Sequence, residues 1–160
     1  MKKIDLGQTL NTLANVGVIA GIVFLGVELR QNTATIQGVT YQGLSEGASN
    51  QYLSVTGNPD LAAVLSRVYN GATLGELESL ENGLMFNFYY AHLQRLENSY
   101  LQLRVGLVDE VVLESYGWND RIFRTPHFSE FWQQFGGDAV SPQFREFFDD
   151  QMAEKGLLQT

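Results

Sequence analysis

The sequence predicts an all-α protein in which an N-terminal single-pass transmembrane helix continues into a soluble helical bundle of about six helices. Three observations lead to this prediction. An uncharged apolar run near the N-terminus has charged residues at both ends. Apolar residues then recur at helical spacing in segments separated by glycine, proline and capping residues. No short segment alternates apolar and polar side chains between turns, as a half-buried strand would.

The apolar run near the N-terminus has the length of a membrane-spanning helix. Residues 10–29 supply the roughly 20 predominantly apolar positions that a bilayer requires. We therefore predict a transmembrane anchor helix over residues 1–29 and an acidic helical-bundle domain over residues 30–160. Two alternatives stay open. One is a buried helix of a soluble fold. The other is a signal peptide that would begin at Lys2 and Lys3, although no small-residue cleavage site follows the run.

Small residues form a strip along the predicted span. Gly17, Ala20 and Gly21 share one helix face, because residues four apart differ by only about 40° around the helix axis. Such a strip lets a second helix approach closely in lipid and predicts self-association, although GxxxG spacing is also frequent by chance in glycine-rich apolar spans. Gly43 and Gly47 repeat the spacing and predict a second helix-packing contact.

The segment that follows the span is expected to continue the same helix. Between Leu10 and Thr56 there is no proline and no breaker stronger than glycine. We therefore predict one long helix that leaves the membrane and reaches about Thr56. Gly38 and Gly43 are the positions where it would kink.

Capping residues and glycines delimit the remaining helices. Each predicted helix opens at a capping residue, a capping box or a proline and closes at glycine or at the end of an apolar stripe. The predicted helices are 59–69 between Gly57-Asn58-Pro59 and Asn70-Gly71, a long one from the Thr73/Glu76 capping box to Gly106, one from Asp109 to about Phe123, one from Thr125-Pro126 to Gly136-Gly137, and one from Ser141-Pro142 to about Met152. The apolar stripe predicted for the long helix is Leu77, Leu80, Leu84, Phe88, Leu93, Leu96, Tyr100 and Leu103.

The composition excludes several classes of function. The 160 residues carry 18 acidic and 10 basic side chains, and the net charge of -8 disfavours nucleic acid and anionic lipid as partners. The absence of cysteine excludes disulfides, thiolate zinc sites, iron–sulfur clusters and cysteine nucleophiles. Neither of the two histidines has the glutamate three residues earlier that a di-metal helical bundle uses. No nucleotide-binding or nucleophile-elbow motif is present, so we expect no cofactor, no metal and no catalytic residue.

Four polar residues on and after the long helix are expected to have structural roles. His92 and Arg95 are three residues apart and can share a face, whereas Glu97 points elsewhere. We expect Arg95 or Glu97 to hold this helix to the next one, for example through Arg95 with Asp109 or Glu114. An enzyme of unfamiliar type that uses His92, Arg95 and Glu97 is an alternative interpretation.

Aromatic residues crowd the last third of the chain. Phe131, Trp132, Phe144, Phe147 and Phe148 are the centre of this group. The first interpretation is a packed core between the last two helices. The second is an exposed aromatic patch for a partner or for the membrane interface, where aromatic rings are enriched.

Several short motifs resemble a family of small uncharacterised bacterial proteins with an N-terminal transmembrane helix, an RQNT motif and a helical domain. The motifs that carry the resemblance are Glu28-Leu29-Arg30-Gln31-Asn32-Thr33, Asn58-Pro59-Asp60-Leu61, Arg95-Leu96-Glu97-Asn98-Ser99-Tyr100, Gly106-Leu107-Val108-Asp109 and Ser141-Pro142-Gln143-Phe144-Arg145. The resemblance covers nearly the whole chain and implies this architecture but no reaction. One departure is that only Arg30 closely follows the span, where such proteins are expected to have more basic residues.

The sequence as a whole favours a non-catalytic membrane-anchored interaction protein, either self-associating or an accessory subunit of a larger membrane complex. Lipid would surround residues 10–29. The alternative is a small-molecule or lipid-binding module with an aromatic-lined pocket. We expect a single pass through the bacterial inner membrane. Lys2 and Lys3 outnumber Arg30 near the span and favour a cytoplasmic N-terminus with the soluble domain in the periplasm.

Overall fold

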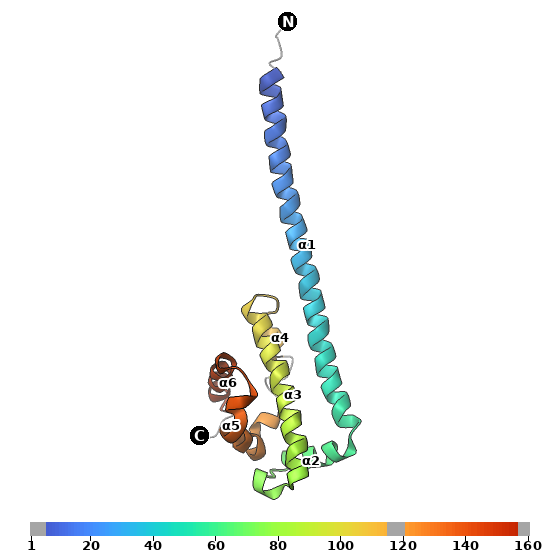
Figure 1. The fold of residues 1–160 in the computed structure, drawn as a ribbon, viewed down its shortest axis with the longest axis vertical. Helices are drawn as coiled ribbons and strands as arrows, with labels where there is room; N and C mark the ends of the chain where they lie inside the picture. Colours follow the sequence, from blue (N-terminus) through green and yellow to red (C-terminus); the bar gives the residue numbers. More distant parts are fainter. Residues whose placement is uncertain (1–5, 115–120, 157–160) are drawn as a thin grey trace. The chain divides into compact units, whose positions relative to one another are not determined.

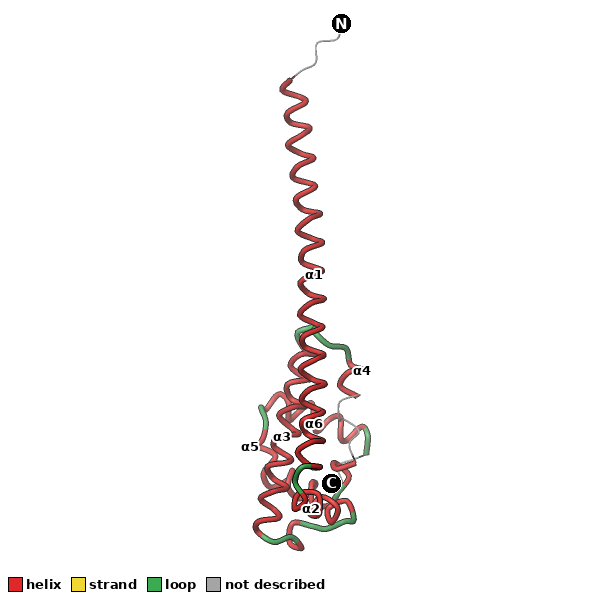
Figure 2. The backbone as a smooth tube through the Cα atoms, turned by 90° about the vertical axis from the view of Figure 1, so that its right-hand side faces the viewer, coloured by secondary structure: helices red, strands yellow, loops and turns green. Residues whose placement is uncertain are grey.

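The structure is a computed structural model that describes residues 6–114 and 121–156. Within these ranges it contains six α-helices, two short 3-10 turns and no strand. Figure 2 shows the described chain as red helices joined by green loops. The all-α class predicted from the sequence is therefore confirmed. The chain divides into two compact units, Met1–Val39 and Thr40–Thr160. Helix α1 (Leu6–Thr56) is one continuous helix (Figure 1). Its range includes Gly38 and Gly43, so neither glycine ends it.

The first unit contains the N-terminal part of α1, which is apolar and exposed. Among the described helices, α1 is the one whose length and composition would allow it to cross a membrane. Its most apolar stretch of 18 residues has a mean hydropathy of 1.7 and no buried residue. Large side chains such as Ile22 and Phe24 are about two-thirds exposed, at 65% and 66%. This part of the chain therefore has no apolar interior of its own.

The second unit begins with the last turns of α1 and with α2 (Pro59–Tyr69). The predicted cap is confirmed, because the side chain of Asn58 accepts a hydrogen bond from the Leu61 backbone N–H at 3.1 Å and Pro59 occupies the first turn. Gly57 lies between the two helices. A Cβ at this position would be only 3.0 Å from the Leu53 carbonyl oxygen, so close backbone approach favours glycine here.

The long helix predicted from Thr73 starts later than expected. The capping box of Thr73 and Glu76 is present, but it begins the short 3-10 turn η1 (Leu74–Glu76) and not the long helix. A second box, of Glu78 with Glu81, then begins α3 (Ser79–Arg104). Leu80 of the predicted stripe lies in the first turn of α3 and is 77% exposed. The buried residues of α3 are Met85, Phe88, Tyr89, His92, Leu93, Leu96 and Ser99.

The helix predicted from Asp109 to Phe123 can be compared with the structure only at its two ends. After Gly106, whose φ of 74° ends α3, the described residues begin with the one-turn helix α4 (Glu110–Leu113). Residues 115–120 lie outside the described part of the chain. At 121–124 the chain forms the 3-10 turn η3 (Arg121–Arg124), which places the buried Phe123 against the core.

The last two helices are α5 (Pro126–Ala139) and α6 (Pro142–Glu154), capped by Thr125 and Ser141 as predicted. Gly136 and Gly137 do not end α5, which continues past them. A Cβ at Gly136 would lie 2.5 Å from a ring carbon of Trp132, one helical turn earlier. A Cβ at Gly137 would likewise meet the Arg145 side chain. The two glycines therefore leave space for the side chains of Trp132 and Arg145, and they do not terminate α5.

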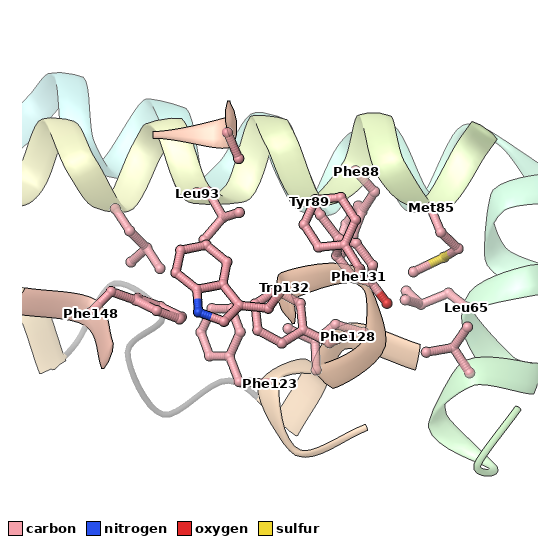
Figure 3. Packing of buried hydrophobic residues seen from close by; sticks show 14 of the residues in the cluster. Leu65, Met85, Phe88, Tyr89, Leu93, Phe123, Phe128, Phe131, Trp132 and Phe148 are labelled. Atoms are coloured by element: carbon pink, nitrogen blue, oxygen red, sulfur yellow. The ribbon is translucent and has the colours of Figure 1, made fainter. Parts of the chain in front are cut away.

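The aromatic residues of the last third form the core of the second unit. Figure 3 shows rings from α5 and α6 packed beneath Tyr89 and Leu93 of α3. The ring centroids of Trp132 and Phe148 are 4.7 Å apart, and those of Tyr89 and Phe131 are 4.8 Å apart.

The prediction of an exposed aromatic patch is wrong for four of its five members. Phe131, Trp132, Phe144 and Phe148 are buried, because α3, η3, α5 and α6 together enclose them. Phe147 is half-buried and stacks on Tyr100 at 4.6 Å. The other interpretation of these residues, a packed core, is confirmed.

Candidate functional site

A groove of about 500 Å³ lies in the second unit, between the last turns of α1, the start of α2 and α3. The α1 wall consists of Gly47, Asn50, Gln51 and Ser54, and their spacing of three and four residues puts them on one helix face. The α3 wall consists of Leu84, Asn87, Phe88, Ala91 and Arg95, which also share a face. The groove remains open because the facing positions Gly47, Ser54 and Ala91 have small side chains.

The floor and the rim of this groove differ in polarity. Phe88 of α3 and Leu61 of α2 are buried and form an apolar floor. Asn50 and Asn87 are exposed and place amide groups at the rim. Such a combination of apolar surface with a few polar groups is typical of small-molecule sites.

One end of the groove holds a polar cluster that joins α1 to α3. The Arg95 Nε donates to the Gln51 Oε1 at 2.9 Å. The Gln51 amide nitrogen is hydrogen-bonded to the Nδ1 of the buried His92, an arrangement that makes Nδ1 the acceptor of a neutral imidazole. The Arg95 Nη2 also lies 3.4 Å from this Nδ1. The cluster fixes the positive charge of Arg95 at the groove.

The structural role predicted for Arg95 is thus present, but with a different partner. Arg95 is hydrogen-bonded to Gln51 of α1, a helix that the sequence analysis did not connect with it. Asp109 is exposed at the N-cap position of α4, and its side chain makes no capping hydrogen bond.

Glu97 links α3 to the last helix instead of the next one. Its carboxylate accepts a hydrogen bond from the Ser141 backbone N–H at 3.0 Å, at the N-terminus of α6. A carboxylate at this position also interacts favourably with the helix dipole. Glu97 and Arg95 therefore serve two different helix contacts and do not form one cluster.

A second polar cluster, which sequence reasoning missed, lies inside the core around the buried His127. The Asn82 amide nitrogen donates to two backbone carbonyls, so its Oδ1 is free to accept from the His127 Nε2 at 2.9 Å. The Tyr89 hydroxyl then donates to the His127 Nδ1 at 3.0 Å. Burial lowers the pKa of His127 and keeps it neutral, and burial also raises the pKa of Tyr89. The cluster joins α5 to α3.

One pattern in the sequence could have identified this histidine as a core residue. His127 lies four residues before Phe131 and directly before Phe128, so it continues the apolar face of its helix. Its polar partners could not be predicted, because Asn82 and Tyr89 lie far away in sequence.

The predicted helix-packing glycines have different surroundings. A Cβ at Gly47 would lie 3.5 Å from the Arg95 Cδ, an ordinary contact, so Gly47 does face another helix of this chain. A Cβ at Gly17, Gly21 or Gly43 would meet nothing within 4 Å. Ala20 is exposed as well. Packing of Gly17, Ala20 and Gly21 against a helix of another chain stays a prediction.

Neither polar cluster resembles a metal centre. Across residues 6–114 and 121–156 no group of three or more histidine or carboxylate side chains is placed to hold a metal ion. Both histidines instead have hydrogen-bond partners on other helices. Comparison of the chain with models of protein families, with curated proteins and with solved structures found no match.

Proposed function

We propose that this protein is a non-catalytic, membrane-anchored helical interaction protein, either self-associating or an accessory subunit of a larger membrane complex. The observation that carries the proposal is the apolar part of α1, whose most apolar stretch has a mean hydropathy of 1.7 and no buried residue. Exposing apolar surface to water costs a free energy of roughly 25 cal/mol for each Å². Lipid around residues 10–29 would remove that cost.

Self-association is supported by the chemistry of the anchor. Helices in lipid gain little from the hydrophobic effect on pairing and associate through close packing at small residues. Gly17, Ala20 and Gly21 provide such a strip, and space around both glycines is open in the single chain. A helix of a second chain could therefore approach this face of α1 without displacing a side chain of the first chain.

The non-catalytic role is supported by the positions of the candidate residues. His92 is tied to Gln51, and His127 is tied to Tyr89 and Asn82. The carboxylate of Glu97 holds the N-terminus of α6. All of these side chains make contacts between helices, which is a structural use.

The proposed location is the bacterial inner membrane, with the second unit in the periplasm. Lys2 and Lys3 precede the span and Arg30 follows it, and basic residues near a span favour the cytoplasmic side. The resemblance of the RQNT and RLENSY motifs to small bacterial membrane-anchored proteins belongs to the same proposal.

Membrane anchoring is tested by fractionation of the full-length chain. We expect it to remain in the membrane pellet after alkaline or high-salt washing and to enter solution only with detergent. A full-length protein that is soluble and monodisperse without detergent would contradict the anchor. Mass spectrometry of the extracted chain also checks whether the N-terminus has been removed, as a signal peptide would be.

Self-association through the small-residue strip is tested by Gly21→Ile, with Gly26→Ile as the matched control on the opposite helix face. A bulky side chain in a crowded helix contact costs on the order of 1–3 kcal/mol. We expect native mass spectrometry in mild detergent to show dissociation of the Gly21→Ile oligomer and an unchanged Gly26→Ile oligomer. An accessory subunit would instead lose a co-purifying partner. Equal behaviour of the two variants would exclude the strip as the contact.

Orientation is tested with a single cysteine at the exposed Glu154, since the chain has no other cysteine. We expect a thiol reagent that crosses only the outer membrane to label this site in intact cells. Labelling that requires lysis would place the second unit in the cytoplasm.

A further inference from the structure

We propose that α1 pairs with α1 of a second copy of this chain as a parallel, in-register coiled coil that continues beyond the membrane. The contact is a seam of six residues in the first unit, at alternating spacings of three and four: Ile22, Leu25, Leu29, Asn32, Ile36 and Val39. The inference rests on the anchoring and self-association proposed above, and it adds the surface, the orientation and the register of the contact.

The spacing of the seam residues is that of a coiled coil. Alternate steps of three and four residues average 3.5, which keeps one row of side chains facing a second helix. Within residues 30–39 the large apolar side chains are Ile36 and Val39, and both fall on the row that begins in the apolar run. The charged residues of the same stretch of α1, Glu28 and Arg30, lie outside the seam. An identical seam can therefore face it without charge repulsion.

Lipid covers only the first part of this seam. Val39 follows Leu29 by ten residues, which places it about 15 Å further along the helix. Ile36 and Val39 are nevertheless 44% and 67% exposed. Every described residue of the first unit belongs to α1, so the described part of this unit contains no second helix that could cover them. A helix from another copy removes this apolar surface from water.

The membrane anchor selects a parallel partner of the same sequence. Copies of one chain cross the bilayer in the same direction and at the same depth, so each seam residue meets its own equivalent. Asn32, which is exposed in the single chain, then faces Asn32 of the second copy, and an amide side chain both donates and accepts hydrogen bonds. A single polar residue in such a seam specifies the register, because a shift would place the amide against apolar side chains.

The residues beside the seam are compact. The Thr33 hydroxyl donates to the Leu29 carbonyl oxygen, and the Thr35 hydroxyl donates to the Gln31 carbonyl oxygen, both at 2.9 Å. These hydrogen bonds hold both side chains against their own helix. A second helix can therefore approach the seam closely on either side of Asn32.

The seam also adjoins the small-residue strip of the membrane span. Gly21 lies four residues before Leu25, so the two residues differ by only about 40° around the helix axis. A Cβ at Gly21 would meet nothing within 4 Å in the single chain. One neighbouring helix can therefore contact Gly21 within lipid and the seam residues beyond it.

The test is disulfide cross-linking of single-cysteine variants in isolated membranes, since the chain has no other cysteine. Ile36→Cys and Val39→Cys lie on the seam. Ala34→Cys is the matched control, because Ala34 is exposed in the same stretch but lies roughly 200° around the helix from Ile36. With copper phenanthroline as oxidant, we expect both seam variants to form a covalent dimer at least tenfold faster than Ala34→Cys. Mass spectrometry of the product should give twice the mass of the chain.

The outcomes separate this inference from the proposed function. Equal cross-linking at residues 34, 36 and 39 of a chain that is oligomeric by native mass spectrometry would overturn the seam and leave self-association intact. A monomeric chain that cross-links at none of these positions would overturn both. A cross-linked product that contains a different protein would overturn the choice of a second copy.

A pair of charge variants tests the seam without a covalent bond. Ile36→Asp places like charges opposite each other in the coiled coil, and we expect it to weaken association at least tenfold in native mass spectrometry. Ala34→Asp adds the same charge on the opposite face and should associate as the original chain does. Unchanged association of Ile36→Asp, or an equal loss in both variants, would overturn the seam.

Discussion

The two units of this chain use the same apolar side chains in opposite ways. Phe24 in the first unit is 66% exposed, whereas Phe128 in the second unit is fully buried. In the first unit, Gly21 has open space around it, whereas Gly136 in the second lies against the Trp132 ring. The difference indicates that the second unit buries its apolar surface within the chain, whereas the described part of the first unit leaves its large apolar side chains exposed.

The largest expected difference between the two units in unfolding free energy comes from removing one aromatic ring in each. Phe128→Ala deletes a ring that contacts Phe123 and Trp132, and a Phe→Ala change in a core costs about 3–5 kcal/mol. Phe24→Ala should leave the unfolding of the second unit unchanged. Chemical denaturation in detergent, followed by tyrosine and tryptophan fluorescence, measures both. Similar losses in the two variants would mean that the first unit is part of the same core.

A smaller effect is expected from adding a methyl group at two glycines. Gly136→Ala would force the Trp132 ring to move, and overpacking of this kind costs about 1–3 kcal/mol. Gly38→Ala meets open space and should not lower the unfolding free energy of the second unit. Gly83→Ala, also in open space but within α3, should raise that free energy by up to about 1 kcal/mol through helix propensity. A stabilised Gly136→Ala variant would contradict the packing of Trp132.

The buried His127 is expected to make the second unit sensitive to pH. Burial lowers its pKa below the ordinary value of 6.5, and the nearby Glu130 only partly offsets this. The unfolded chain therefore binds the proton more readily, and the unfolding free energy should fall as the pH drops below 6.5.

The measurement for His127 is a set of denaturation curves between about pH 7 and pH 5, a range that lies above the usual carboxylate pKa values. His127→Gln, which cannot titrate, should show a smaller pH dependence over this interval. An identical pH dependence in both proteins would exclude His127 as its source.

The smallest expected effect is at Leu80, which the apolar pattern of the sequence placed on a buried face. Leu80 is 77% exposed, so Leu80→Gln should change the unfolding free energy by no more than about 0.5 kcal/mol. Leu93, a buried residue of the same helix, provides the contrast, because Leu93→Ala should cost about 2–5 kcal/mol. A large loss at Leu80 would indicate that a partner or a second copy covers this position.

Local sequence patterns were sufficient for the class and for most helix boundaries. The caps at Asn58, Thr125 and Ser141 are confirmed because a cap depends on hydrogen bonds within three residues. The ends at Gly71 and Gly106 are confirmed because a positive φ is a property of the residue itself. The apolar stretch of α1 was recognisable for the same reason, since hydropathy and length are local quantities.

The tertiary structure alone decided how these elements use their side chains. Gly136 could be interpreted as a helix end until the Trp132 ring was placed against it. The partners of Arg95 and Glu97 are Gln51 and Ser141, each more than 40 residues away in sequence, and local spacing contains no information about contacts at that distance. The groove has the same origin, because it exists only where small residues on α1 and α3 come to face each other across the fold.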